Sequence, residues 1–169
     1  MRLTPVMQRY IVHWGEMGSR WGMNRSVAQI HALLYLSAEG LHADEIAETL
    51  GIARSNVSVG LKELLAWNLV QITHSLGDRR DFFLAQQDPW EVIRVIIEGR
   101  KRREIDPTVA VLRECVAQLK TDSETPATVR DRLTGQLEFL ETVTSWYDSI
   151  KTLLKMMRLG SRIAKVMGE

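Results

Sequence analysis

The sequence predicts a mainly α-helical fold in which two short helices are followed by a small β-hairpin. Apolar residues recur at helical spacing over most of the 169 residues. A glycine, Gly51, separates two short amphipathic segments within residues 41–68. Over residues 69–84 the hydrophobic period changes to that of two short strands around a turn at Gly77 and Asp78. This order is typical of a winged helix-turn-helix domain with a β-hairpin wing, here flanked by long N- and C-terminal helices.

Composition narrows the class of protein without identifying it. Hydrophobic residues make up 45% and charged residues 25% of the chain, which is ordinary for a globular protein. The net charge is only +1, so a basic patch for nucleic acid has to be local. No run reaches the roughly 18 apolar residues of a membrane span, and the N-terminus lacks a secretory apolar stretch. With the single cysteine Cys115 as well, we expect a cytoplasmic protein that does not enter a membrane.

Two helices are expected before the helix-turn-helix. The first runs from about Thr4 to Gly18 and is followed by a break at Gly22. Its apolar positions are Val6, Tyr10, Val12, Trp14 and Met17. The second is capped by Asn24 or Ser26 and is expected to end at Gly40, because glycine tolerates the left-handed conformation. Its apolar face includes Val27, Ile30, Leu33, Leu34 and Leu36.

The helix-turn-helix is assigned to residues 41–68. The segment Leu41–Gly51 contains the first helix, of about eight residues, with Asp44 and Glu45 in its first turn, and we expect Ile46, Ala47 and Leu50 to face inward. In the second helix, the inward face contains Val57, Leu61, Leu64 and Leu65. Its opposite face is polar and carries Arg54, Ser55, Asn56, Ser58 and Lys62.

That polar face has the chemistry of a helix that enters the major groove of DNA, which is wide enough to admit one. Arg54 can donate to a guanine edge or a phosphate, and Asn56 can pair with adenine or a phosphate. Ser55 and Ser58 can reach phosphates. Lys62, two turns along, is better placed to neutralise backbone charge.

The predicted wing consists of strands at Leu69–Thr73 and Asp81–Leu84. Its tip carries two adjacent arginines, Arg79 and Arg80. An arginine on a wing can enter the minor groove, where negative potential is enhanced. Asp78 repels phosphate, so its expected role is to orient an arginine by a charge-assisted hydrogen bond. The alternative is a solvated charged turn.

The C-terminal half is expected to be helical. Asp88 caps a helix that begins at Pro89, kinks or breaks near Pro107 and continues to Leu119. After a loop at 121–125, a second helix covers 127–159, and Gly160 and Ser161 interrupt it before a short tail helix. Basic residues recur at helical spacing here, at Lys151, Lys155, Arg158, Arg162 and Lys165. They fit a membrane surface, a phosphate contact or a dimer helix with a solvated basic face, and we favour the dimer helix.

Three segments resemble the MarR superfamily of winged-helix regulators, and more closely its GbsR-like branch. They are GLHADEIAETLGIARSNVSVGLKELLAWNLV, GDRRDFF and RREIDP, within a resemblance that covers roughly Gly22 to Pro107. The resemblance implies a DNA-binding transcriptional regulator, a repressor rather than an activator, that forms an obligate homodimer through its terminal helices. It places Asp78 and Arg80 on an Asp-x-Arg wing pattern, with Arg80 in the minor groove and Arg79 on phosphate.

The domain organisation follows from this. We expect an N-terminal dimerisation helix at 1–23, the DNA-binding domain at 24–87 and a C-terminal helical dimerisation region at 88–169. In the dimer, the two recognition helices occupy successive major grooves ~34–36 Å apart. A small-molecule effector that changes this spacing would change the affinity for DNA. The five tryptophans fit core and interface positions, and the alternative of an aromatic box for a choline-type effector stays open.

Other classes of function find little support in the sequence. The four histidines and one cysteine do not have the spacing of a metal site, and no cofactor is expected. His31 is expected to be packed, and the apolar neighbours of Cys115 favour a buried thiol over a redox sensor. No phosphate loop, paired-carboxylate site or nucleophile motif indicates an enzyme, and RREID is expected to form solvated salt bridges. The competing class is a winged-helix module that binds proteins rather than DNA.

Overall fold

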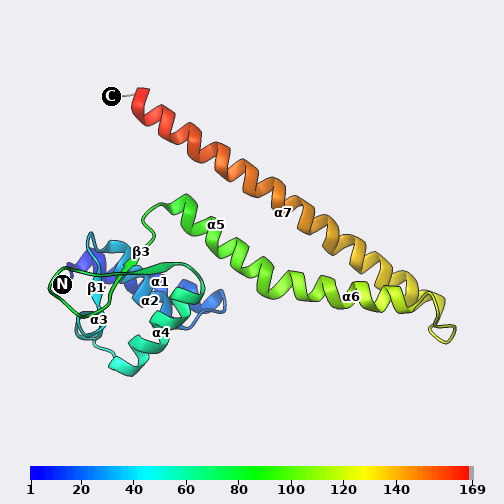
Figure 1. The fold of residues 1–169 in the computed structure, drawn as a ribbon, viewed down its shortest axis with the longest axis horizontal. Coiled ribbons are helices and arrows are strands. Elements are labelled where there is room, and N and C mark those ends of the chain that lie inside the picture. Colours follow the sequence, from blue (N-terminus) through cyan, green and yellow to red (C-terminus); the bar gives the residue numbers. More distant parts are fainter. Residues whose placement is uncertain (168–169) are drawn as a thin grey trace. The chain divides into compact units, whose positions relative to one another are not determined.

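The computed structural model describes the backbone of residues 1–167, and side chains for residues 1–147, 149, 150, 152, 153 and 156. The chain forms two compact units, Met1–Val95 and Ile96 onward, which are described separately. Figure 1 shows the elements in chain order, which are α1 (Pro5–Arg20), α2 (Arg25–Leu36), β1 (Leu41–His42), α3 (Ala43–Leu50), α4 (Arg54–Ala66), β2 (Val70–Thr73), β3 (Phe82–Ala85), α5 (Pro89–Arg100), η1 (Lys101–Ile105), α6 (Asp106–Gln118) and α7 (Ala127–Met167). The predicted winged helix-turn-helix fold is confirmed.

The core of the first unit lies between α2, α3 and α4. Its largest fully buried side chains are Ile30, Leu33, Leu34, Ile46, Val57, Leu64 and Leu69. Gly60 lets α4 lie close to α2, because a Cβ there would stand 2.7 Å from Ile30 Cδ1. The inward face predicted for α4 is confirmed at Val57, Leu61 and Leu64, whereas Leu65 is only half-buried.

Helix α1 packs against α2 through small residues, so the apolar face predicted for it is partly wrong. Val6 and Val12 are 79% and 44% exposed, and the buried residues are Ile11, Gly15 and Gly18. A Cβ on Gly18 would overlap Ala28 Cβ on α2. Glycines therefore allow the two helices to approach, and larger apolar side chains do not mark the contact.

The segment between α2 and α3 differs from its prediction. Helix α2 begins at the predicted cap, where Asn24 Oδ1 accepts a hydrogen bond from Ser26 N (2.9 Å), but it ends at Leu36 rather than at Gly40. Gly40 precedes the two-residue strand β1, and a Cβ there would stand 3.1 Å from both Phe82 Cβ and Thr73 Oγ1. A side chain at this position would therefore crowd the sheet, and the glycine does not mark a helix end.

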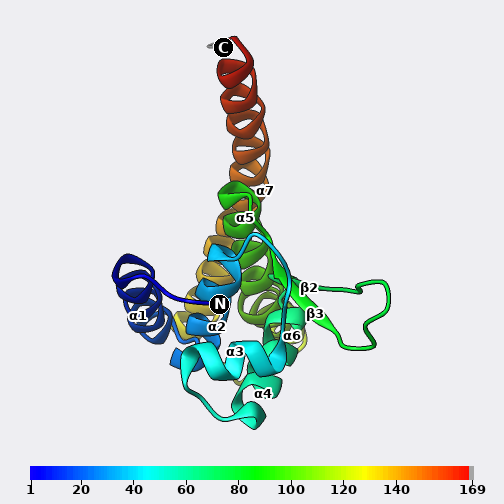
Figure 2. The ribbon, with the colours of Figure 1, turned by 90° about the vertical axis from the view of Figure 1, so that its left-hand side faces the viewer.

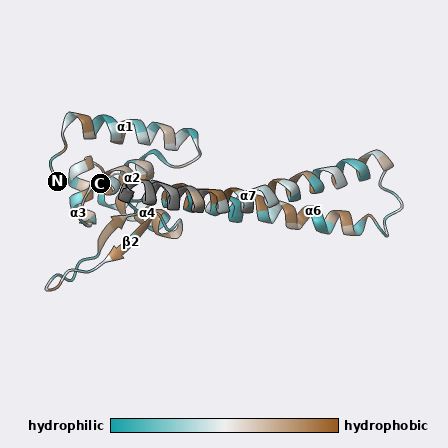
Figure 3. Cartoon of the chain, turned by 90° about the horizontal axis from the view of Figure 1, so that it is seen from above, coloured by the Kyte–Doolittle hydropathy of each residue, from teal (hydrophilic) through white to brown (hydrophobic). Residues whose placement is uncertain are grey.

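The sheet is antiparallel, in the order β1-β3-β2. In β1, Leu41 pairs with Phe83 and His42 with Phe82, a pairing that the sequence analysis did not predict. The hairpin of β2 and β3 matches its predicted range to within a residue, in the register Val70↔Ala85 to Thr73↔Phe82. Figure 2 shows this hairpin projecting from the helices of the first unit, and Figure 3 shows apolar strands joined by a largely hydrophilic loop.

The second unit contains the predicted helix break. A π-helical turn, η1, precedes α6, and Asp106 N–H donates to Lys101 O. Pro107 has no N–H, and its ring crowds the carbonyl four residues earlier, so the wider turn accommodates it. The solvated salt bridges expected in RREID are present, from Lys101 Nζ to Asp106 Oδ1 (2.6 Å) and from Arg100 Nη1 to Glu104 Oε1 (3.3 Å).

Helices α6 and α7 pack against each other across the loop predicted at 121–125. Arg130 holds this loop by donating to the carbonyls of Leu119 (2.7 Å) and Thr125 (2.9 Å) and to that of Asp122. Helix α7 runs unbroken to Met167, so the predicted interruption at Gly160 and Ser161 is wrong. The basic side chains assigned to the tail, Lys151, Lys155, Arg158, Arg162 and Lys165, lie outside the described residues.

Within residues 1–167 no helix is both long and apolar enough to cross a membrane. Cys115, expected to be buried, is only partly so. His31, expected to be packed, is 3% exposed on α2, between the rings of Trp14 and Tyr35 at centroid distances of 6.5 and 6.4 Å. Its Nε2 atom has no hydrogen-bond partner, and burial lowers the pKa of the imidazole to about 4.

We predict that His31 makes the protein less stable in weak acid. The folded imidazole resists protonation while the unfolded chain binds a proton near pH 6.5, so stability is full above that pH and falls as the pH drops towards 4. Between pH 7.5 and 5.5 the loss is about 1 kcal/mol. Urea unfolding at both pH values should show this loss in the wild type and its absence in His31→Leu. The control His13→Gln, at an exposed position, should keep the wild-type dependence.

Candidate nucleic-acid interface

The helix-turn-helix is formed by α3, a tight turn and α4. Gly51 ends α3 in the left-handed conformation (φ 64°), as its sequence position predicts. At the other end, His42 N donates to Glu45 Oε2 (3.1 Å), and Glu45 N lies 3.4 Å from His42 Nδ1. This capping arrangement and the glycine fix both ends of the helix that supports α4.

The outer face of α4 carries the five residues predicted for the polar face of the second helix, Arg54, Ser55, Asn56, Ser58 and Lys62. Ser55, Asn56 and Lys62 are exposed, Arg54 is half-exposed, and Ser58 lies at the edge of the face. Because Val57, Leu61 and Leu64 are held in the core, this face points away from the rest of the unit. The structure therefore brings the five residues onto one surface, and their contacts with DNA stay a prediction.

Arg54 is already bonded within the protein. Its Nε donates to Asp44 Oδ1 on α3 (2.7 Å), and its Nη1 donates to Ser58 Oγ on the next turn of α4 (2.5 Å). The pair is solvent-exposed, so its contribution to stability is small. Its structural effect is to hold the guanidinium at the start of α4, beside the other predicted contact residues.

The wing arginine, Arg80, is held by three neighbours. Its Nη2 and Nε donate to the carboxylate of Asp78 at 2.5 and 3.0 Å, and Arg80 N donates to Asp78 Oδ1 (3.0 Å). Its guanidinium carbon lies 5.7 Å from the centre of the Phe82 ring, and its Nη1 lies 2.7 Å from His42 Nε2. The hydrogen bond that the sequence predicted between Asp78 and an arginine is present, and that arginine is Arg80. Arg79 is exposed.

The bonds from Arg80 lower the pKa of Asp78 to about 2. A carboxyl with a depressed pKa keeps its ionised, bonded form at every pH well above that value. The same bonds raise the pKa of Arg80. The pair is therefore fully charged at neutral pH, and the wing tip keeps a defined arginine geometry instead of a freely rotating side chain.

His42 connects the wing to α3, a role that no local sequence pattern indicates. Arginine only donates, so the 2.7 Å contact requires His42 Nε2 to accept. The other ring nitrogen, Nδ1, lies 3.4 Å from Glu45 N within the cap of α3. The glutamate three residues after His42 is the one local signal of a cap at this position.

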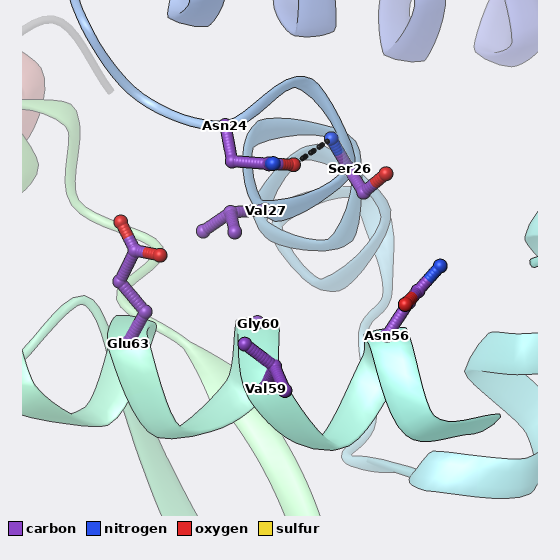
Figure 4. A pocket seen from close by; sticks show the side chains of 7 residues that line it. All are labelled: Asn24, Ser26, Val27, Asn56, Val59, Gly60 and Glu63. Atoms are coloured by element: carbon purple, nitrogen blue, oxygen red, sulfur yellow. Dashed lines mark hydrogen bonds between the residues drawn. The ribbon is translucent and has the colours of Figure 1, made fainter. Parts of the chain in front are cut away.

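A shallow pocket of about 200 Å³ lies between the start of α2 and α4 (Figure 4). It is lined by Asn24, Ser26, Val27, Asn56, Val59, Gly60 and Glu63. Glu63 gives this hollow a negative charge, which disfavours phosphate. Val59, 65% exposed, stands on its rim next to the predicted contact residue Asn56, and sequence reasoning directed at polar side chains missed it.

Within the described part of the chain, no three histidine, cysteine or carboxylate side chains gather as metal ligands would. The arrangement found here is instead a surface of hydrogen-bond donors on α4 and the wing tip.

The comparisons with known proteins agree with this geometry. A model of the MarR family matches residues 21–81. The HTH-type transcriptional repressor GbsR of Bacillus subtilis (strain 168) is 24% identical over 143 residues, which are 83% of this chain and 79% of that protein. A crystal structure of a transcriptional regulator superposes with a TM-score of 0.66 at 15% identity, over 90% of this chain and 99% of that one. Residues 21–81 therefore match the MarR family, in a chain that is similar over most of its length to the repressor GbsR and that shares the fold of a solved transcriptional regulator.

Proposed function

We propose that this protein is a GbsR-like transcriptional regulator of the MarR superfamily, a homodimeric repressor that binds double-stranded DNA with α4 in the major groove and the wing at the minor groove. The observation that carries the proposal is the hydrogen-bonded node of Asp78, Arg80 and His42. It joins the wing tip to α3, the helix on which α4 is mounted. A fixed arginine and a fixed reading helix can then meet neighbouring grooves of the same duplex.

Each predicted contact residue takes one role in this proposal. Ser55 and Asn56, near the start of α4, meet base edges or the adjacent phosphates, and Arg54 exchanges Asp44 for the DNA. Lys62 and Arg79 neutralise phosphates, with Ser58 at the edge of the same surface. Arg80 enters the minor groove in the orientation set by Asp78.

The homodimer is supported by an apolar stripe on α7. Phe139, Trp146, Ile150 and Leu153 are 65%, 65%, 46% and 51% exposed, and Val143 continues the stripe between the first two. The spacings of four, three, four and three residues are those of a helix seam that packs against a second helix. A second copy of α7 covers such a stripe and provides the two-fold axis for two reading helices.

Control of repression follows from the same assembly. A small-molecule effector that favours one spacing of the two α4 helices in the dimer lowers or raises the affinity for DNA. Its class is not fixed by any contact in the described residues. By relation to the family, the protein works in the cytoplasm without a membrane partner, a cofactor or catalysis.

The wing is tested by Arg80→Ala in a mobility-shift assay on DNA selected from random sequence by the wild-type protein. Loss of one groove contact should weaken binding about tenfold or more. Arg102→Ala, which removes an exposed arginine of η1, is the matched control and should bind as the wild type does. Equal binding by Arg80→Ala would contradict the wing assignment alone. Failure of the wild type to bind any fragment at low salt would contradict DNA binding itself.

Salt dependence tests Lys62 and separates DNA binding from a protein-binding module. Each phosphate contact contributes about 0.9 to the slope of log K against log salt, so Lys62→Ala should reduce the slope of the dimer by about two. Lys120→Ala, at an exposed position after α6, should leave it unchanged. A flat salt response in the wild type would instead favour the protein-binding alternative.

The role of the apolar stripe on α7 in dimerisation is tested by Ile150→Lys. The side chain is exposed in the single chain, so the substitution should spare the monomer fold while placing a charge in the dimer interface. Sedimentation at micromolar concentration should show a dimer for the wild type and a monomer for the variant. Ser145→Lys adds the same charge off the stripe and should remain dimeric. A monomeric wild type would contradict the proposal that two α4 helices of a homodimer bind the same DNA.

A further inference from the structure

Val59 occupies the centre of the outward face of α4. Ser55, Val59 and Lys62 follow one another at spacings of four and three residues, so they form one stripe along the helix. This stripe lies opposite the buried residues Val57, Leu61 and Leu64. Val59 is therefore flanked on both sides by residues assigned to DNA contact.

Val59 differs from the other valine of α4 in its exposure. Its side chain is 65% exposed, whereas Val57, two residues earlier, is fully buried. Valine also lowers helix stability relative to alanine, because its branched Cβ is restricted in the helix. An exposed valine at the middle of the reading face is thus suited to an external apolar contact.

The stiffness of valine makes that contact geometrically defined. In a helix its χ1 angle has one strongly preferred rotamer, so its two methyl groups keep one position relative to the α4 axis. Figure 4 shows Val59 on the same helix as Asn56 and Glu63, at the edge of the shallow pocket. Polar side chains and the apolar Val59 are therefore presented together on α4.

We propose that Val59 reads the 5-methyl group of a thymine in the major groove. That methyl is the one apolar feature that distinguishes an A·T pair there, and apolar side chains recognise it by contact. The proposal rests on the proposed function, because it requires α4 to lie in the major groove. It adds a residue that selects sequence without forming a hydrogen bond.

Uracil is the matching probe, because it differs from thymine only by this methyl group. In the selected site, each thymine is replaced singly by deoxyuridine, and the Kd is measured for the full-length wild type and for Val59→Ala. At one position in a half-site the wild type should lose affinity about fourfold, the effect of one unburied methyl. Val59→Ala should bind the thymine site more weakly and show no uracil effect at that position.

Two further variants serve as a conservative substitution and as a control. Val59→Thr retains the branched shape and one methyl, and should show an intermediate uracil effect. Val111→Ala, at a helix position of similar exposure (59%) on α6, should keep the full wild-type uracil profile. The proposal is overturned if the wild type is indifferent to uracil at every thymine, or if Val59→Ala keeps the wild-type profile. Both outcomes leave DNA binding intact, so they differ from failure of the proposed function, in which no DNA is bound.

Discussion

The packing of α4 against α2 is the constraint on which the rest of the first unit depends. Gly60 brings α4 within contact of Ile30, and the buried side chains Val57, Leu61 and Leu64 hold the helix in one rotation about its axis. Once that rotation is fixed, Ser55, Asn56 and Lys62 have to face outward. The surface assigned to DNA is therefore a direct consequence of core packing and not of contacts among its own residues.

Strong local signals predicted most of the fold. The left-handed glycine at 51, the cap at Asn24 and the change to strand periodicity near residue 69 each depend on a few neighbouring residues, and each lies where the sequence predicts it. Strand β1 was missed because two residues form a strand only by pairing with β3, some forty residues later. The buried face of α1 was misassigned because close helix packing selects Gly15 and Gly18 over large apolar residues.

The residues of the candidate site could be predicted from their types, but the residues to which they bond could not. A search for polar side chains on a helix face finds Arg54, and a search for a basic turn finds Arg80. It does not find Asp44 or His42, which meet these arginines across 10 and 38 residues of sequence. Val59 was missed for a different reason, since an apolar residue in an amphipathic helix is normally assigned to the core.

The salt bridges of two arginines with aspartates have a consequence for how a protein that binds DNA through this surface searches a genome. Arg54 and Arg80 are each neutralised by an aspartate in the free protein. In the proposed binding mode, arbitrary DNA has to displace Asp44 from Arg54 and tolerate the charge of Asp78 beside Arg80, so transient encounters gain little free energy from either arginine. A duplex of complementary shape engages both at once, together with the rest of the α4 face. The pairing of these arginines with aspartates within the protein thus shortens the residence time on non-specific sites more than on the specific site. It increases the preference for the specific site without any additional contact to a base.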